Sequence, residues 1–328
     1  MTISSRYQCL GSWRLPLRND YKARHLETNF RKTLKSLDPN LSRPRDTGFL
    51  LVVLGLIWGS SFILIKRILP CFSPVQYALG RIILTGICFS PWIFNSIKQV
   101  SRKQLFWAIV VALMGYLGSY LFMGLSQTHI GSSVAGILAS LNPMFTFIFG
   151  LIFFNQSFRW KNLWGIVVGL LGCLFLLFNG EGHSGWQIEH YALFMIMSVV
   201  MSSITINIIQ KQLKGLGSIA IASLTFGILV VPALLFFVIG TDYLAPFNHP
   251  QIIRCSLAFL CLCIVSTVIG SLMYYHIIAR MGALYTSTVT YIIPLMAIVW
   301  GMLDGESIGW NEIIGFVFIL GGIRLVRA

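Results

Sequence analysis

Apolar residues from position 47 onward form long continuous runs that are separated by short polar segments. A helix needs about 20 apolar residues to cross the hydrocarbon core of a bilayer, and these runs have that length. They are continuous, whereas strands of a membrane barrel alternate inward and outward over about 10 residues. The pattern predicts an all-α integral membrane protein. We expect ten transmembrane helices near residues 48–69, 74–95, 105–127, 132–154, 163–179, 191–210, 218–239, 256–279, 284–303 and 311–326.

The composition of the chain excludes a water-soluble enzyme. Of the 328 residues, 56% are hydrophobic and only 10% are charged, whereas soluble chains average roughly 25% charged residues. The net charge of +14 is typical of nucleic-acid-binding proteins. The positions of the basic residues therefore decide what the charge means.

The basic residues are sorted by loop. With the N-terminus in the cytoplasm, 20 Lys and Arg residues fall on the cytoplasmic side and 3 on the outer side. The positive-inside rule therefore predicts that both termini are cytoplasmic. Because this sorting accounts for the net charge, no nucleic-acid partner is expected. Residues 1–46 are predicted to form a basic cytoplasmic tail, either as an interfacial helix or as a solvated segment. That this segment is an organelle transit peptide is a further alternative.

The two halves of the apolar region repeat each other. Asn142-Pro143, Gly150, Trp160 and Gly165 recur as Ile293-Pro294, Gly301, Trp310 and Gly315, at an offset of 151 or 150 residues. Each half has five predicted spans, and five is odd, so the second half must enter the membrane from the opposite side. The sequence predicts two inverted five-helix repeats over residues 47–180 and 188–328, an arrangement that many secondary transporters use for alternating access. No GxxxxGK[ST] motif is present, and no cofactor is expected.

Several motifs resemble one family of membrane proteins. They are Trp58-Gly59-Ser60-Ser61-Phe62 with Lys66, Arg81, Leu141-Asn142-Pro143 with Gly150, and Tyr291-Ile292-Ile293-Pro294 with Gly301, Gly305-Glu306 and Gly315. Together they are similar to the EamA-type branch of the drug/metabolite transporter superfamily, over about residues 48–326. Gln156 departs from the family, whose first repeat usually has Glu there, and so does the long tail. The resemblance implies export or exchange of a small metabolite, often an amino acid or related solute, across a plasma or bacterial inner membrane.

Arg81 lies deep in a predicted span. That span begins with Ser73 as N-cap and Pro74 at the first helical position, which places Arg81 about 12 Å from the end at about 1.5 Å per residue. At that depth the guanidinium must snorkel, pair or face water. If Arg81 and Lys66 both face the pathway, they form a cationic outer vestibule for a carboxylate or phosphate. The alternative is that both snorkel to lipid headgroups.

Pro143 and Pro294 lie near the middle of repeat-related spans. Each removes one backbone hydrogen bond and frees a carbonyl one turn earlier, near Ala139 and Thr290. Such carbonyls persist at membrane depth only where protein or a water-lined cavity meets them. Spans four and nine are therefore predicted to line the pathway, with packing kinks as the alternative.

Hydrogen-bonding aromatic side chains near the same helices suit an amphipathic metabolite. With the family motif positions, they complete the set of candidate residues. The predicted substrate-binding residues are Trp58, Ser61, Lys66, Arg81, Tyr116, Tyr120, Asn142, Pro143, Tyr274, Tyr291 and Pro294.

No carboxylate lies inside any predicted span. This argues against a cationic substrate, because a buried acid normally replaces the lost hydration of a cation. We predict a secondary active transporter, an exporter or exchanger, for a small anionic or zwitterionic metabolite. The alternative is an integral membrane enzyme with an outer-face metal site at Glu181, His183, Glu189 and His190. No HExxH motif accompanies that cluster, and a solvated loop explains it without a metal.

The cysteines and glycines carry two further expectations. The seven cysteines show no CxxC pair and are predicted to be unpaired small apolar residues in lipid or in the core. The fifth and tenth predicted spans carry small-residue faces, which predict close helix packing, with a homodimer contact as the alternative. These faces are formed by Gly165 with Gly169 and by Gly315 with Gly322.

Overall fold

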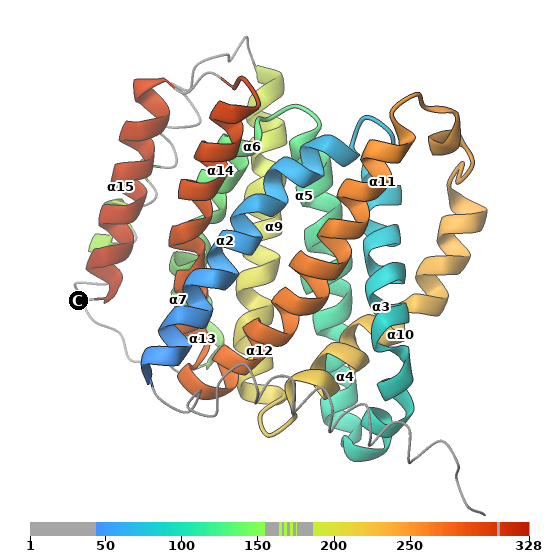
Figure 1. The fold of residues 1–328 in the computed structure, drawn as a ribbon. Helices are drawn as coiled ribbons and strands as arrows, with labels where there is room; N and C mark the ends of the chain where they lie inside the picture. Colours follow the sequence, from blue (N-terminus) through green and yellow to red (C-terminus); the bar gives the residue numbers. More distant parts are fainter. Residues whose placement is uncertain are drawn as a thin grey trace, which may run out of the picture. The chain divides into compact units, whose positions relative to one another are not determined.

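In a computed structural model of the protein, the described residues are 44–154, 186–306 and 309–327, with isolated positions between 164 and 175. The predicted tail and most of the fifth predicted span lie outside them. Residues Pro44–Ala328 form one compact unit. Its described part is a bundle of helices without a β-strand (Figure 1).

The first half of the chain supplies four long helical runs. They are α2 (Pro44–Ile68), α3 (Pro74–Gln99), the continuous run of α4 (Arg102–Val110), η1 (Val111–Gly118) and α5 (Ser119–Gln127), and the broken run of α6 (Ser132–Ala139) and α7 (Asn142–Phe154). The second half repeats this order. It contains α9 (Trp186–Gln212), α10 (Ser218–Gly240), a short η2 (Ala245–Asn248), the run of α11 (Ile252–Cys261), η3 (Leu262–Ile269) and α12 (Gly270–Met281), the run of α13 (Ala283–Ser287), η4 (Thr288–Tyr291) and α14 (Ile292–Leu303), and α15 (Trp310–Arg327).

Eight of these described runs are long and apolar enough to cross a membrane. The tenth predicted span is α15, whose apolar part, Ile313–Gly322, is shorter than the other eight. The fifth predicted span falls mostly outside the described residues. The prediction of an all-helical membrane fold is therefore confirmed, whereas ten transmembrane helices are not.

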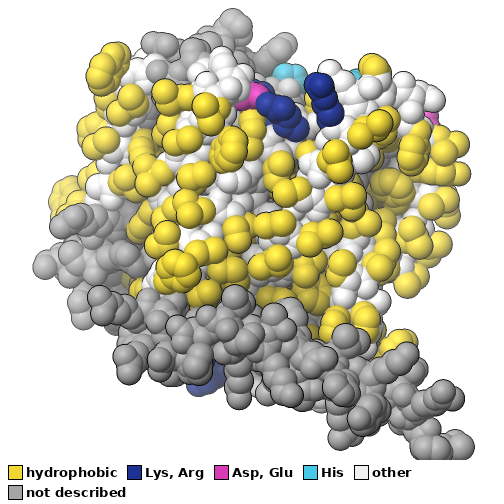
Figure 2. Space-filling model, viewed as in Figure 1, with side chains coloured by type: hydrophobic (Ala, Val, Ile, Leu, Met, Phe, Trp, Pro, Cys, Tyr) yellow, Lys and Arg dark blue, Asp and Glu magenta, His cyan; other side chains and the backbone are white. Residues whose placement is uncertain are grey.

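The exterior of the bundle is apolar, and polar side chains are buried inside it. Phe49 and Ile239 are 68% and 82% exposed, while the hydroxyl-bearing Thr146 and Ser203 are fully buried. Figure 2 shows hydrophobic side chains across the middle of one face, with charged side chains near its upper rim. This distribution suits a surface that meets lipid, where every polar group needs an internal partner.

α3 begins where the sequence predicted. Ser73 has an extended backbone, its hydroxyl accepts a hydrogen bond from Gln76 N at 3.3 Å, and the Gln76 side chain accepts one from Ser73 N at 2.8 Å. This capping box, with Pro74 in the first turn, satisfies free donors at the helix start. It fixes the position of Arg81, two turns further along α3.

The helices of the two halves have equivalent neighbours. α3 packs along α10, α2 packs along α14 and along α11 and α12, and α9 packs along α7 and along α5. α2 and α9 run in opposite directions across the bundle (Figure 1). The π-helical segments η1 and η3 begin at Val111 and Leu262, which are separated by the predicted repeat offset of 151 residues.

Both predicted proline sites are helix breaks. α6 ends at Ala139 and α7 begins at Asn142, so Pro143 lies in the first turn of a new helix. In the second half, η4 separates α13 from α14, and Pro294 lies in the first turn of α14. Proline has no N–H group, so it is tolerated at a helix start and disrupts a helix interior.

The prediction that all seven cysteines are unpaired is wrong for two of them. Cys71, in the connection between α2 and α3, forms a disulfide with Cys255 of α11, 184 residues away. His249 Nδ1 lies 3.3 Å from Cys71 Sγ. Because the disulfide occupies both thiols, this Cys–His–Cys group has no free thiolate for a metal ion. Sequence spacing could not reveal the pair, since the two cysteines meet only when α2 packs on α11.

Candidate substrate site

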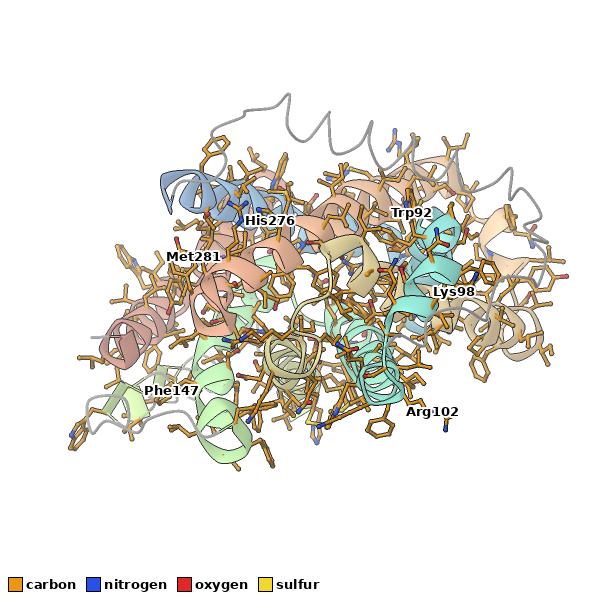
Figure 3. The ribbon with its side chains drawn as sticks, turned by 90° about the horizontal axis from the view of Figure 1, so that it is seen from below. Trp92, Lys98, Arg102, Phe147, His276 and Met281 are labelled. Atoms are coloured by element: carbon orange, nitrogen blue, oxygen red, sulfur yellow. A yellow bond between two sulfur atoms is a disulfide. The ribbon has the colours of Figure 1, made fainter. Side chains whose placement is uncertain are left out.

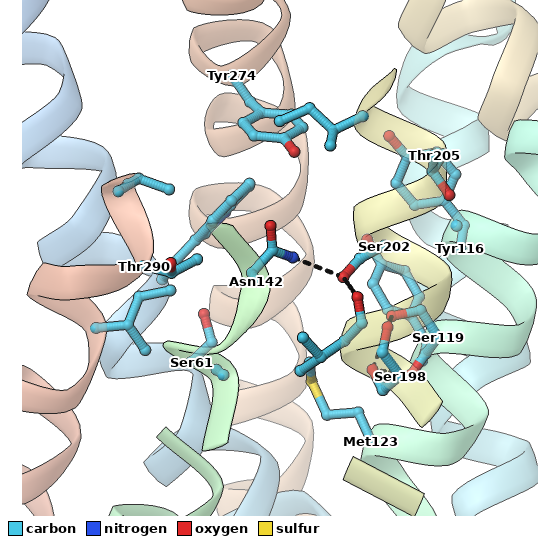
Figure 4. Close-up of a pocket in the computed structure, with 18 of the residues that line it drawn as sticks. Ser61, Tyr116, Ser119, Met123, Asn142, Ser198, Ser202, Thr205, Tyr274 and Thr290 are labelled. Carbon is cyan, nitrogen blue, oxygen red and sulfur yellow. Dashed lines mark hydrogen bonds between the residues drawn. The ribbon is translucent and has the colours of Figure 1, made fainter. Parts of the chain in front are cut away.

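A cavity of about 150 Å³ lies between helices of the first and second halves (Figure 4). Its described lining is rich in hydroxyl and aromatic side chains and has one cation. Among the described residues no Asp or Glu lines it. The polar and aromatic residues of the lining are Trp58, Ser61, Phe62, Arg81, Tyr116, Ser119, Tyr120, Asn142, Ser198, Ser202, Thr205, Ser266, Ser271, Tyr274, Ser287 and Thr290.

Arg81 is the cation of this central cavity, and only 5% of it is exposed. Its Nε donates to Thr267 Oγ1 at 2.8 Å, and its Nη1 donates to the Tyr77 hydroxyl at 2.8 Å. The guanidinium carbon lies 3.8 Å from the centroid of the Tyr120 ring. Within the described residues, no carboxylate pairs with Arg81. Neutral oxygens and aromatic faces therefore fix the guanidinium, and its charge stays available to an anionic ligand.

Hydroxyl pairs join the helices around the cavity. Ser61 of α2 and Ser266 of η3 have oxygens 2.5 Å apart, and Ser119 of α5 and Ser198 of α9 have oxygens 2.8 Å apart. These two bridges join equivalent helix pairs of the two halves. Asn142 Nδ2, at the start of α7, donates to Ser202 Oγ at 2.9 Å (Figure 4). The cavity wall therefore offers fixed hydroxyl and amide groups that can exchange partners with a polar solute.

One side of the cavity is aromatic. The rings of Trp58 and Tyr274 have centroids 4.8 Å apart, and Trp58 Nε1 donates to the Ser266 carbonyl at 3.0 Å. The Tyr116 hydroxyl forms a hydrogen bond with that of Tyr275. Aromatic faces of this kind accept planar rings by stacking and cationic groups by cation–π attraction.

A network of charged and hydroxyl groups links helices at one end of the bundle, which we name the outer end after the predicted orientation. Lys66 Nζ lies 2.8 Å from Glu306 Oε1 and 2.7 Å from Asp304 Oδ2. Arg67 Nη2 lies 2.5 Å from Asp304 Oδ1. With Ser132 and Ser133 at the start of α6, these residues form the outer latch. It ties α2 and α6 of the first half to the residues that follow α14 in the second.

Glu306 is the centre of the outer latch. Besides Lys66, its Oε1 accepts from Ser132 N and Oγ, both at 2.9 Å, and its Oε2 accepts from Ser133 Oγ at 2.7 Å and Ser133 N at 3.1 Å. Burial opposes ionisation of the carboxyl group, but the hydrogen bonds from Lys66, Ser133 and the backbone outweigh it and lower the pKa of Glu306 to about 2. The latch carboxylate therefore stays charged at neutral pH.

The family profile described as the EamA-like transporter family matches residues 47–178 and again residues 190–328. The chain belongs to the EamA-like transporter family. The two matches together span nearly all of the membrane part of the chain. This EamA-like transporter is therefore an integral membrane protein.

Relatives of this EamA-like transporter are named as transporters, not as enzymes. The S-adenosylmethionine/S-adenosylhomocysteine transporter of Chlamydia muridarum is 25% identical, over 85% of this chain and 90% of its own length. The probable amino-acid metabolite efflux pump of Salmonella typhimurium is 22% identical, over 86% of this chain and 94% of its own. A crystal structure with 16% identity has a TM-score of 0.59, over 85% of this chain and 94% of the other, and shows a shared fold. The protein is a transporter of small metabolites.

Seven of the eleven predicted substrate-binding residues of this EamA-like transporter line the central cavity. They are Trp58, Ser61, Arg81, Tyr116, Tyr120, Asn142 and Tyr274. Ala139 and Thr290, near which the prolines were predicted to free a carbonyl, line it as well.

The other four predicted residues are placed elsewhere. Lys66 lies in the outer latch and not beside Arg81, so these two cations do not share one vestibule. Pro143 and Pro294 are buried in the first turns of their helices, where they shape the cavity without lining it. Tyr291 packs against a hydrophobic cluster. The alternative metal cluster falls largely outside the described residues, which exclude Glu181 and His183.

Sequence reasoning missed the hydroxyl face of α9. Ser198, Ser202 and Thr205 line the cavity from one helix at spacings of four and three residues. That spacing places them on one helical face, and it was visible in the sequence. Thr267, which accepts a hydrogen bond from Arg81, carried no such signal, because its role depends on where α3 meets η3. Tyr77 lies four residues before Arg81 on α3, a local spacing that the sequence shows.

Proposed function

We propose that this transporter exports or exchanges its substrate by alternating access between two inverted repeats, residues 47–180 and 188–328. The equivalent packing of the two halves, the opposite directions of α2 and α9 and the offset of 151 residues between η1 and η3 support this arrangement. The outer latch is closed, which fits a state whose central cavity is reached from the opposite, inner end.

The proposed substrate is a small anionic or zwitterionic metabolite with a planar ring or another apolar body. Arg81 carries the proposal, because it is a buried cation on the cavity wall without a described carboxylate partner. A substrate carboxylate would supply that partner. The Trp58 and Tyr274 rings suit a planar or cationic group. Amino acids and S-adenosylhomocysteine, compounds that appear in the relatives' names, combine a carboxylate and an ammonium group.

The proposed location is a plasma or bacterial inner membrane, with both termini in the cytoplasm. The distribution of Lys and Arg residues supports this orientation. The disulfide between Cys71 and Cys255 supports it independently, because it lies in the segments assigned to the outer face. Disulfides persist in oxidising compartments and are rare in the cytosol.

The test is efflux from proteoliposomes loaded with labelled amino acids and S-adenosylhomocysteine. We expect Arg81→Gln to lower flux at least tenfold, which corresponds to the loss of one charged hydrogen-bonding interaction of about 1.5–3 kcal/mol. Arg81→Lys keeps the charge and should retain intermediate flux. Lys103→Gln, in the first turn of α4 at the inner end, is the matched control for removal of one cation. Equal flux by wild type and Arg81→Gln at matched protein levels would refute the proposed binding role.

A further inference from the structure

A second cavity, of about 610 Å³, opens at the inner end of the bundle. It lies where the end of α9, the start of α10 and the turn between α12 and α13 meet. Figure 3 views the bundle from below and labels Met281, one of its lining residues. Its described lining contains Lys211, Lys214 and Arg280 but neither Asp nor Glu.

The two lysines of this inner cavity have no anionic partner among the described residues. Within the described part of the chain, neither Lys211 nor Lys214 forms an ion pair, and Lys211 Nζ lies 5.4 Å from the centroid of the Phe154 ring. The positive-inside rule accounts for their presence at this end. The rule does not explain why Lys211 and Lys214 both line one cavity, where their positive electrostatic potentials add.

The outer latch is the counterpart of this inner cavity at the other end of the bundle, and there a carboxylate neutralises the cation. In the latch, Glu306 binds Lys66 and caps the start of α6 at Ser132 and Ser133. The residues 151 positions later are Ala283 and Leu284, at the start of α13. There the cap is a neutral amide, since Ala283 N donates to Gln210 Oε1 at 3.1 Å. Within the described lining, the inner end therefore repeats the cation and the helix start of the outer end without the carboxylate.

The inner cavity also adjoins the central one. Ile209 lines both cavities and directly precedes Gln210 and Lys211 on α9. Tyr275 lines the inner cavity, and its hydroxyl bonds to that of Tyr116 in the central lining. A solute held by Lys211 and Lys214 would therefore lie beside the route to Arg81.

We propose that the inner cavity is a docking site for an anionic group, a carboxylate or a phosphate, which Lys211 and Lys214 hold before the solute reaches the central cavity. The role in transport rests on the proposed function, whereas the anion site itself does not. A lipid phosphate at the cytoplasmic surface has the same chemistry as a solute phosphate and competes for the same site.

The test uses the full chain in nanodiscs of phosphatidylcholine, with malonate and inorganic phosphate as probes and calorimetry as the readout. Lys211→Gln with Lys214→Gln should weaken binding about tenfold, since two solvent-exposed charge interactions are lost. Lys98→Gln with Lys103→Gln removes two cations from the same end, away from the cavity, and should change affinity less than twofold. Equal affinities for wild type and the Lys211/Lys214 variant, or equal losses in both double variants, would overturn the site.

Two further experiments are needed. The first distinguishes a lipid headgroup from a solute as the source of the anion, and the second distinguishes failure of the inner site from failure of the proposed function. Adding phosphatidylglycerol should weaken malonate binding by wild type if lipid headgroups occupy the site, and leave it unchanged if only solutes do; either result supports an anion site. The Arg81→Gln variant should keep the Lys211-dependent malonate binding. Absence of efflux by the wild type with that binding intact counts against the proposed function alone. Arg81-dependent efflux by the wild type with no Lys211-dependent binding counts against the inner site alone.

Discussion

The outer and inner ends of the bundle are built from equivalent parts and differ in charge. At the outer end, Lys66 is neutralised by Glu306 and Asp304, and the helix start at Ser132 is capped by a carboxylate. At the inner end, Lys211 and Lys214 line an open cavity without a described acid. Under the proposed alternating access, a few side chains at the ends decide which end stays closed, since each closed end needs its own stabilising contacts.

The covalent link at the outer end predicts the largest effect. Removing the disulfide with Cys71→Ser and Cys255→Ser should lower the free energy of unfolding by about 2–4 kcal/mol, because the bond closes a long loop of chain. Thermal unfolding in detergent measures the change. Cys88→Ser, which removes a free exposed thiol, is the control and should be close to neutral. A double variant as stable as wild type would mean that the link contributes nothing to the outer end.

Neutralising the latch carboxylate should make the outer end resemble the inner end, which has no described acid beside its lysines. Glu306→Gln loses charge-assisted bonds worth about 1.5–3 kcal/mol each, so the outer end should open more often. We expect a reporter thiol, Ser271→Cys in the central cavity, to react at least tenfold faster with an impermeant reagent added outside. Asp242→Asn removes an acid that forms no ion pair among the described residues and is the matched control. Unchanged labelling of the Glu306→Gln protein would show that the latch does not hold the outer end shut.

The smallest effect concerns pH. Because the pKa of Glu306 is lowered to about 2, its contribution to the latch is full above the ordinary carboxyl value of about 4.3. That contribution is lost only as pH falls through the range between the two values. The outside labelling rate of the Ser271→Cys reporter, corrected for the reagent's own pH dependence, should therefore be flat from pH 5 to pH 8 and rise below pH 4. A midpoint between pH 5 and pH 8 would contradict this account of the latch.

The sequence predicted the position of a residue where that position follows from its depth and its helix. Arg81 was placed from one helix cap and a rise per residue, and the break at Pro143 follows from the missing N–H group of proline. Lys66 shows the limit of such reasoning. Its position in the helix was clear, but its partner is 240 residues away in the sequence, and nothing local distinguishes a cation that faces a pathway from one that meets a distant carboxylate.

The sequence by itself determined that this chain is an all-helical membrane protein with a repeated order of spans. The length of an apolar run and the position of a proline are local properties of the chain. They decide whether each segment can form a helix that crosses the bilayer, independently of the other helices. Only the tertiary structure decided which side chains meet: Arg81 with Thr267, Lys66 with Glu306, and Cys71 with Cys255. Those contacts depend on how helices from the two halves pack, and a difference of about one turn would give each side chain another neighbour.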